Sequence, residues 1–560
     1  MKKKIIILST LVALHFCCRA QTAFPTIDSL TINNINAALL VHGDMFWNPA
    51  LETSATFFPR GTVHNNNFAG SIWMGGYDAS NNLHIDAQTY RQDGNDYWPG
   101  ILDAADTLSY TSSSNWNKIW KVYKIEIDTF VAQATHDSAS TPRSILTWPG
   151  KGNTYAAGAV GTLTMVPGRT YAPFVDLNGN GIYEPLLGEY PQIKGDEALW
   201  EVFTDRGPTH NQTKGLSLGM EVQLMVYGYN RGTLMDNVIY YSYKLTNYSA
   251  NTYHNFRLTM WDDIDLGWYD NDYIGFDSTW RLGVNYNGTD CDSCGSGAAP
   301  NAYVGKIPIS GMTLVHVGFV SANDATSYMP VACFDYYNND MSSIGNPSND
   351  TGFNYYMRDT ILDGQPFLND FMGPGIPSIG YGAGTPSRYV YPGNPADSTQ
   401  WSECVSGNVP GDRRFLITAG DFTVLPGESD EITFAFITTC LDTLNACPQT
   451  SFDSIKIYAD TAWGNYEDPF APSSVTSVTP PSGSILLFPN PAHDHIYLIT
   501  TDDINNCNIQ VVNTLGQMMQ VGVNYTGGKF DLDISLLPPG VYVVQYHNNG
   551  TLKTGMFVRD

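Results

Sequence analysis

Val238-Ile-Tyr-Tyr-Ser-Tyr-Lys-Leu245 is one of the clearest strand patterns in this 560-residue chain. It is rich in β-branched and aromatic residues, and turn residues such as Asn and Gly lie near its ends, which is typical of a β-strand. Val222-Gln-Leu-Met-Val-Tyr227 and Ile432-Thr-Phe-Ala-Phe-Ile437 repeat the pattern. Short strands separated by turns predict an all-β fold, with a sandwich-like body.

Helical patterns are scarce. The best one runs from Ser451 to Trp463, where Ile455, Tyr458, Ala459 and Ala462 fall on one face of a helix. No internal repeat of fixed period is visible, which argues against a propeller or a solenoid. The helical segment is therefore expected to be an accessory to strands.

The N-terminus has the pattern of a secretory signal peptide. Lys2, Lys3 and Lys4 precede a mostly apolar stretch up to Phe16, and Ala20 offers a small residue for cleavage before residue 21. The apolar stretch is too short for a membrane span, which needs about 20 residues. A lipoprotein cysteine is the other alternative, and bulky Phe16 argues against it. We expect residues 1–20 to be removed.

The remaining chain divides by composition. A weak boundary separates a loop-rich β region from a strand-dense, β-sandwich-like region, and a segment rich in Pro, Ser and Thr is typical of an extended linker. A compact β module follows the linker. The expected segments are residues 21–215, 216–467, 468–484 and 485–560.

The chain is strongly acidic. Without residues 1–20 it has 24 Lys and Arg against 54 Asp and Glu, a formal charge of −30. This charge repels nucleic acid and anionic lipid, so neither is an expected partner. No later segment has 18 consecutive apolar residues, so no transmembrane anchor is expected. Acidity at this level favours solubility outside the cell or binding of divalent cations.

The C-terminal module carries a resemblance. Phe488-Pro-Asn-Pro-Ala492, Asn513-Thr-Leu-Gly-Gln517 and Leu532-Asp-Ile-Ser-Leu-Leu-Pro-Pro-Gly-Val-Tyr542 resemble the type A C-terminal sorting domain of type IX secretion system cargo. The resemblance implies a small Ig-like β-sandwich over residues 485–560 that engages the type IX machinery. It also implies passage through the periplasm, then release or attachment to surface lipopolysaccharide.

The body resembles uncharacterised proteins that carry the same sorting domain. The stretches that carry this resemblance are Gly43-Asp-Met-Phe-Trp47, Ala87-Gln-Thr-Tyr-Arg91, Asp205-Arg-Gly-Pro-Thr-His210 and Gly411-Asp-Arg-Arg-Phe-Leu416. The resemblance implies no activity.

One loop has calcium-ligand spacing. Oxygen-bearing side chains alternate from residue 176, a Gly stands at the sixth position, and a backbone carbonyl follows at the seventh. Leu187 replaces the Glu that closes an EF-hand loop. Glu184, Glu189 or Asp196 must therefore supply that ligand. The alternative is an Asn/Gly turn without metal. The predicted ligands are Asp176, Asn178, Asn180, Ile182, Glu184 and Glu189.

A second acidic cluster follows the strand that ends near Trp261. Asp263, Asp265 and Asp270 belong to five carboxylates within eleven residues, which repel one another unless water or a cation intervenes. We expect these residues to hold a calcium ion together with backbone carbonyls. A solvated acidic loop is the alternative.

The spacing of the cysteines indicates candidate disulfides. Cys291 and Cys294 are expected to form a small disulfide, Cys440 and Cys447 are candidates for another, and Cys507 is expected to be free.

No nucleophile elbow, zinc-protease helix, P-loop or dinucleotide fingerprint occurs. His210 near Asp205, and Glu197 with Glu201, are candidate acid/base groups.

These observations predict a secreted or cell-surface protein, non-enzymatic and stabilised by calcium, that serves in adhesion or as an envelope component. Two alternatives remain. One is a secreted polysaccharide hydrolase with its carboxylates near residues 196–205. The other is a carbohydrate-binding protein, since exposed Trp and Tyr stack on sugars.

Overall fold

A computed structural model describes the chain in two compact units, Met1–Pro472 and Ser473–Asp560. The predicted signal peptide, most of the predicted linker and Cys294 lie outside the described residues. Described are residues 26–470 without 294–298, 320–330, 378–379, 381–383, 441–446 and 448–449; the second unit is described at 486–488, 492, 494–499, 507–513, 516–526, 529–548 and 551–559.

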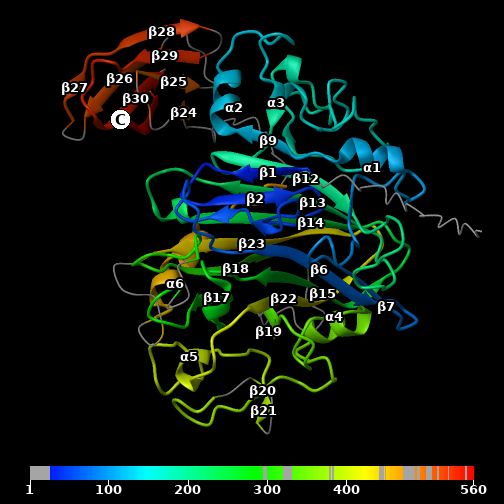
Figure 1. Cartoon of the computed structure of the whole chain (residues 1–560). Helices are drawn as coiled ribbons and strands as arrows, with labels where there is room; N and C mark the ends of the chain where they lie inside the picture. The colour runs from blue at the N-terminus through cyan, green and yellow to red at the C-terminus, as the bar shows by residue number, and fades with distance from the viewer. Residues whose placement is uncertain are drawn as a thin grey trace, which may run out of the picture. The chain divides into compact units, whose positions relative to one another are not determined.

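The first unit is built on a nine-stranded antiparallel sheet, called here the large sheet. The stretch around Val238 forms its central strand, which is buried along nearly its whole length because both faces of the sheet are covered. In spatial order the strands are β16 (Asp272–Asp277), β17 (Leu282–Asn287), β18 (Ile309–Val317), β23 (Ser429–Thr439), β14 (Val238–Asn247), β13 (Met220–Gly228) and β12 (Glu197–Thr204), with β8 (Trp98–Pro99) and β9 (Trp120–Tyr123) both on β12 (Figure 1).

A five-stranded antiparallel sheet, the small sheet, packs on one face of the large sheet. Phe334 of the small sheet stacks on Phe276 of the large sheet with ring centroids 4.8 Å apart. Met260 and Ile417 face Leu224 in the same buried core. The strands in spatial order are β19 (Val331–Asn338), β22 (Arg413–Val424), β15 (Tyr253–Asp263), β6 (Ala69–Tyr77) and β7 (Leu83–Ala87).

Helices and loops cover the other face of the large sheet and form a second core. Trp116, Ile127 and Ile145 from one set of short helices and Ile455 from the longest helix pack with Trp200 of β12. The helices of the first unit are α1 (Tyr110–Trp116), α2 (Lys124–Val131), α3 (Arg143–Leu146), α4 (Asp350–Tyr356), α5 (Glu403–Ser406), α6 (Asp453–Gly464), η1 (Pro185–Leu187), η2 (Leu234–Asn237) and η3 (Tyr269–Asn271). Of these, α4 packs against the small sheet instead.

Short strand pairs complete the first unit. They are β1 (Ile27–Leu30), β2 (Asn36–Leu40) and β5 (Thr56–Phe57); β3 (Trp47–Asn48) and β4 (Thr53–Ser54); β10 (Phe174–Val175) and β11 (Tyr190–Pro191); and β20 (Leu368–Asn369) and β21 (Thr385–Pro386).

The second unit is a small sandwich of two four-stranded antiparallel sheets. Ile496 and Leu532 of one sheet share a core with Val544 and Phe557 of the other. The strands are β24 (Leu486–Phe488), β25 (His495–Ile499), β29 (Lys529–Asp533) and β28 (Gly522–Thr526), then β27 (Met518–Met519), β26 (Cys507–Asn513), β30 (Gly540–Asn548) and β31 (Thr551–Arg559).

The all-β prediction is confirmed, but the predicted boundary between residues 215 and 216 is wrong. Strand β6 precedes it and pairs with β15, and β12 pairs with β13 across it. Because hydrogen-bonded strands from both sides share sheets, the described residues before and after this boundary form one sandwich. The loop-rich composition before residue 215 belongs to segments that cover the large sheet.

The predicted cysteine pairing also changes. Cys447 forms a disulfide with Cys404, 43 residues earlier, and not with Cys440. The disulfide links the α5 segment to the chain that follows β23. Cys507 carries a free thiol, as predicted.

Candidate functional site

Charged side chains converge where β15 ends beside the start of β22. Asp263 lies directly opposite Arg414 in the antiparallel register, so both side chains project from the same face of the small sheet. Arg414 Nη2 lies 3.1 Å from Asp263 Oδ1, and Arg414 also pairs with Asp412. The 3.1 Å contact is an ion pair that is not aligned as a hydrogen bond.

Asp263, Asp265 and Asp412 form the carboxylate cluster. One oxygen from each lies within 4.8 Å of the others. Asp265 follows Asp263 at an interval of two residues and Asp412 precedes Arg414 at the same interval, so the ends of two paired strands bring the three together. Oxygen atoms at this spacing are suited to a hard cation.

The Tyr90 hydroxyl bridges the carboxylate cluster and the guanidinium of Arg414. It donates to Asp263 and accepts hydrogen bonds from Arg414 Nη2 at 2.8 Å and Nε at 3.2 Å. Asp263 is 2% exposed, and Arg414 is likewise buried. Tyr90 and Arg414 therefore fix the orientation of the Asp263 carboxylate.

The carboxylate cluster carries more negative charge than its surroundings compensate. Burial raises the pKa of Asp263 to about 6, although Arg414 opposes the shift. Burial, followed by the charge of Asp263, raises the pKa of Asp265 well above its ordinary value. One guanidinium faces three carboxylates, so full ionisation leaves a local charge of about −2. Protons or a divalent cation relieve this charge.

The carboxylate cluster borders a pocket of 330 Å³, called here the aromatic pocket. Four aromatic side chains contribute to its wall, and Tyr269 is half-exposed there. The lining residues are Trp47, Glu52, Phe68, Tyr90, Gln92, Asp263, Asp265, Tyr269, Asn339, Asp412 and Arg414. The site therefore combines ring surfaces with acceptors and a cationic donor.

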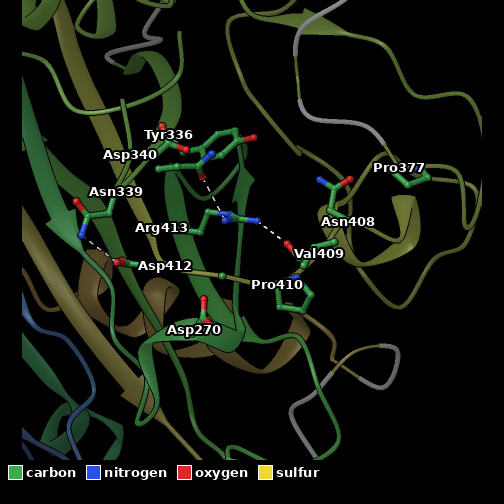
Figure 2. A pocket seen from close by; sticks show the side chains of 12 residues that line it. Asp270, Tyr336, Asn339, Asp340, Pro377, Asn408, Val409, Pro410, Asp412 and Arg413 are labelled. Carbon is green, nitrogen blue, oxygen red and sulfur yellow. Dashed lines mark hydrogen bonds between the residues drawn. The ribbon is translucent and has the colours of Figure 1, made fainter. Parts of the chain in front are cut away.

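A second pocket of 430 Å³, the polar pocket, adjoins the first, because Asn339 and Asp412 line both. Arg413 lies at its centre and donates to the backbone carbonyl of Val409 at 2.7 Å (Figure 2). Asn339 Nδ2 donates to Asp412 Oδ2 at 3.2 Å. Asp412 thus faces Arg414 with one oxygen and Asn339 with the other, in the wall between the two pockets.

The loop from Asp176 is folded by its own backbone. The Asp176 oxygens accept N–H bonds from Gly179 and Gly181, both at 2.7 Å, and both glycines have positive φ values near +74° and +73°. Asn178 and Asn180 each donate a side-chain N–H to Glu184. Burial would raise the pKa of Asp176, but the Gly181 and Gly179 N–H groups lower it below its ordinary value.

The loop also encloses a buried acid. Glu189 accepts the N–H groups of Leu177 at 3.1 Å and Glu184 at 2.7 Å. Burial raises its pKa despite these bonds. Leu187 belongs to η1 and is exposed, whereas Glu189 is fully buried.

The second unit is similar to a known family of domains. Residues 486–558 match the family model of a secretion system C-terminal sorting domain. The chain is a type IX secretion cargo. The cargo is therefore exported to the cell surface or the extracellular space. Within the described part of the chain, no helix is long and apolar enough to cross a membrane.

Two solved structures are remotely similar to the cargo. A comparison with curated proteins gave no match. A polysaccharide lyase aligns at 8% identity and a TM-score of 0.17, over 69% of the cargo and 38% of the lyase. The cargo thus spans well under half of that lyase. A biofilm-associated protein BSP domain aligns at 10% identity and a TM-score of 0.16, over 96% of the cargo and 81% of that domain.

The structure separates the residues predicted for the second acidic cluster. Asp263 and Asp265 come together in the carboxylate cluster. Asp270 instead lines the polar pocket, because the 3₁₀ turn η3 carries it away from β15. Asp412 replaces Asp270 as the third carboxylate of the cluster. Calcium at either acidic region of the cargo remains a prediction.

Sequence reasoning missed Asp412 and Arg414 as site residues. A signal was present, because three of the four stretches that resemble other cargo proteins contribute to the aromatic pocket. Trp47 ends the stretch 43–47, Tyr90 lies in the stretch 87–91, and Asp412–Arg414 lies in the stretch 411–416. Their convergence becomes visible only when the small sheet is assembled.

The candidate acid/base groups have structural partners. Glu197 pairs with Lys121 at 3.1 Å, and Glu201 accepts the backbone N–H groups of His42 and Gly43. His210 Nδ1 lies 3.1 Å from Asp86, while Nε2 donates to the backbone carbonyl of Asp205. None of these groups lines the aromatic or the polar pocket.

Proposed function

We propose that the body of this cargo binds glycans at the cell surface through the aromatic and polar pockets. The observation that carries the proposal is that four aromatic side chains line the aromatic pocket beside the carboxylate cluster. A sugar presents apolar C–H faces and hydroxyl groups. Aromatic rings match the faces, while carboxylates, amides and a guanidinium match the hydroxyls.

The polar pocket extends this surface. Asn338, Asn339 and Asn408 add amides beside Arg413, and Tyr336 adds a ring. Adjoining pockets with shared walls suit a chain of sugar units better than one small molecule. A glycan also agrees with the acidic composition, which disfavours nucleic acid. Adhesion to a glycan-coated surface is the role that we assign to the cargo.

Calcium is part of the proposal. The ion takes about six to eight oxygen ligands, so the carboxylate cluster supplies only some of them and leaves positions for water or glycan hydroxyls. A calcium ion also balances the local charge that Arg414 leaves uncompensated. The loop at Asp176, Asn178 and Asn180 is a second proposed calcium site that stabilises the fold away from the pockets.

A glycan array of the secreted protein tests the proposal. The cargo with calcium should bind a defined set of glycans, and Asp412→Asn should lose that binding because Asp412 lines both pockets. Asp453→Asn is the matched control, since Asp453 is an exposed residue of α6 on the other face of the large sheet. Failure of the wild-type protein to bind any glycan would contradict the proposal. Unchanged binding after calcium removal would contradict only its calcium part.

Hydrolysis of a polysaccharide is the second candidate function, and the raised pKa values favour it. A carboxyl group that is protonated near neutral pH beside an ionised one can act as acid and base. One oxygen from each carboxylate lies within 4.8 Å of the others, so the groups are close enough to act on one bond. Release of reducing ends from bound glycans, abolished in Asp263→Asn, would establish hydrolysis over binding alone.

A further inference from the structure

A second group of ligand-type side chains lies elsewhere on the small sheet. Cys333 and Asp335 alternate along β19 and so share one face of the strand. Asp359 reaches the same place from the turn after α4, where its φ of 59° bends the chain back toward β19. The Cys333 sulfur and one oxygen from each aspartate lie within 4.8 Å of one another. These residues are called here the thiol cluster.

Helix α4 covers this part of the sheet. Tyr356 of α4 stacks on Tyr337 of β19 with centroids 5.0 Å apart, and the two elements lie close together in Figure 1. Cys333 is fully buried and Asp335 is 1% exposed. The thiol cluster is thus enclosed, unlike the carboxylate cluster, which borders a pocket.

Asp335 lacks the partners that a buried carboxylate needs. Neither of its oxygens has a hydrogen-bond partner within the described residues, and Asp359 Oδ1 is also buried and unsatisfied. Buried polar groups are nearly always hydrogen-bonded or bound to an ion. An enclosed acid with both oxygens unsatisfied therefore points to a ligand.

The neighbouring cations are committed elsewhere. Arg257 pairs with Asp421 through Nε at 2.5 Å and Nη2 at 3.1 Å, and its Nη1 donates to the Met357 carbonyl at 2.7 Å. Its Nη1 also lies 3.9 Å from Cys333 Sγ. Burial raises the pKa values of Asp335 and Cys333 well above their ordinary range. Burial also raises the pKa of Asp359, to about 6.

We infer that Cys333, Asp335 and Asp359 bind a divalent metal ion of the zinc type. A thiolate with two carboxylates is a donor set that zinc accepts, whereas calcium and magnesium take oxygen ligands and do not use sulfur. The Met357 carbonyl lies 3.5 Å from Cys333 Sγ and accepts the Arg257 hydrogen bond, so it borders the proposed site. Zinc replaces the thiol proton and any carboxyl proton, which are released to solvent.

A bound metal removes most of the negative charge of the thiol cluster. One thiolate and two carboxylates carry three negative charges, and the ion brings two positive charges. The site is independent of glycan binding, since none of its residues lines either pocket. We assign it a structural role in fastening the α4 turn to the edge strand β19.

Metal analysis of the full secreted protein tests this inference. The protein is stripped with a chelator, incubated with zinc sulfate, desalted and measured by mass spectrometry. Wild type should retain zinc in a stoichiometric amount, and Asp335→Asn and Cys333→Ser should lose it. Cys507→Ser and Asp412→Asn are controls for an unrelated thiol and for the carboxylate cluster, and both should retain the zinc.

Cobalt gives a readout that does not depend on the variants folding. Cobalt bound to the wild-type protein should show the near-ultraviolet charge-transfer absorption of a thiolate–cobalt bond, which oxygen ligands alone do not produce. A folded wild-type protein without retained zinc, zinc retained in folded Asp335→Asn, or a cobalt spectrum without the thiolate band would each overturn the inference.

Discussion

The Asp176 loop and the carboxylate cluster contain the same ligand chemistry but satisfy it differently. In the loop, backbone N–H groups from Gly179 and Gly181 saturate the aspartate. In the carboxylate cluster, one guanidinium, one phenol and the Asn339 amide serve three carboxylates. The backbone N–H groups lower the pKa of Asp176, whereas burial raises the pKa of Asp263.

The difference shows where a cation changes the free energy most. An aspartate already held by backbone donors exchanges one set of good contacts for another when calcium binds. Carboxylates that repel one another in a buried site gain compensation that they lack. An acidic sequence motif alone is therefore not enough to rank candidate metal sites. The ranking depends on the hydrogen-bond and ion-pair partners of each carboxylate oxygen.

The largest effect is expected from Arg414→Met. The substitution keeps the volume but leaves Asp263 buried without its cation, which costs about 3–5 kcal/mol of unfolding free energy. Arg231→Met is the control, because Arg231 is half-exposed and 3.6 Å from Asp196, and such pairs contribute about 0–1 kcal/mol. Denaturant unfolding of the two variants compares them. A loss of unfolding free energy below 1 kcal/mol for Arg414→Met would contradict the proposed difference between the carboxylate cluster and the Asp176 loop.

The next effect is a pH dependence. Asp263 has a folded pKa of about 6 against an ordinary value of 3.8, so between these pH values the folded state holds a proton that the unfolded state has lost. Stability therefore falls as pH rises from about 4 to 6 and is constant above. The shift is worth about 3 kcal/mol without calcium. Asp263→Asn should flatten this part of the stability curve; an equal slope in both proteins would contradict the assignment.

Calcium should act chiefly at the carboxylate cluster. A ligand at a hundredfold excess over its Kd stabilises the fold by about 2.7 kcal/mol. Calcium should raise the Tm of the secreted protein, and Asp265→Asn should remove most of that rise. Thermal melts with calcium and with a chelator measure it. Identical melts in both conditions would show that neither the carboxylate cluster nor the Asp176 loop binds calcium.

The smallest effect is expected from Asp176→Ala. The variant loses two short backbone hydrogen bonds in an exposed loop, which costs about 1 kcal/mol, as for a lost helix cap. It should remove the smaller part of the calcium response. In the double variant with Asp265→Asn, additive losses would indicate two independent ions. A larger calcium loss from Asp176→Ala than from Asp265→Asn would reverse the ranking of the two regions.

Local patterns predicted the elements well. The runs at Val222, Val238 and Ile432 lie within β13, β14 and β23, and the helical pattern at residues 451–463 lies over α6. The sorting domain was recognisable because its turns and strands repeat a specific spacing over residues 485–560. These features depend on interactions between residues close in sequence.

Pairing over long distances was not predictable. Asp263 meets Arg414 only through the register of β15 with β22, and Cys404 meets Cys447 only after β22 and β23 have returned the chain. No residue type near Asp263 indicates a partner so far along the sequence. The site was therefore half predicted, with Asp263 and Asp265 found and Asp412 missed.

Titration calorimetry with a glycan identified on the array shows whether the aromatic pocket is the ligand site. We expect calcium-dependent binding to the wild-type protein and unchanged binding to Asp453→Asn. Binding to Asp412→Asn should be at least tenfold weaker, corresponding to about 1.4 kcal/mol. Equal affinity of Asp412→Asn and wild type for the same glycan would place the binding site outside the aromatic pocket.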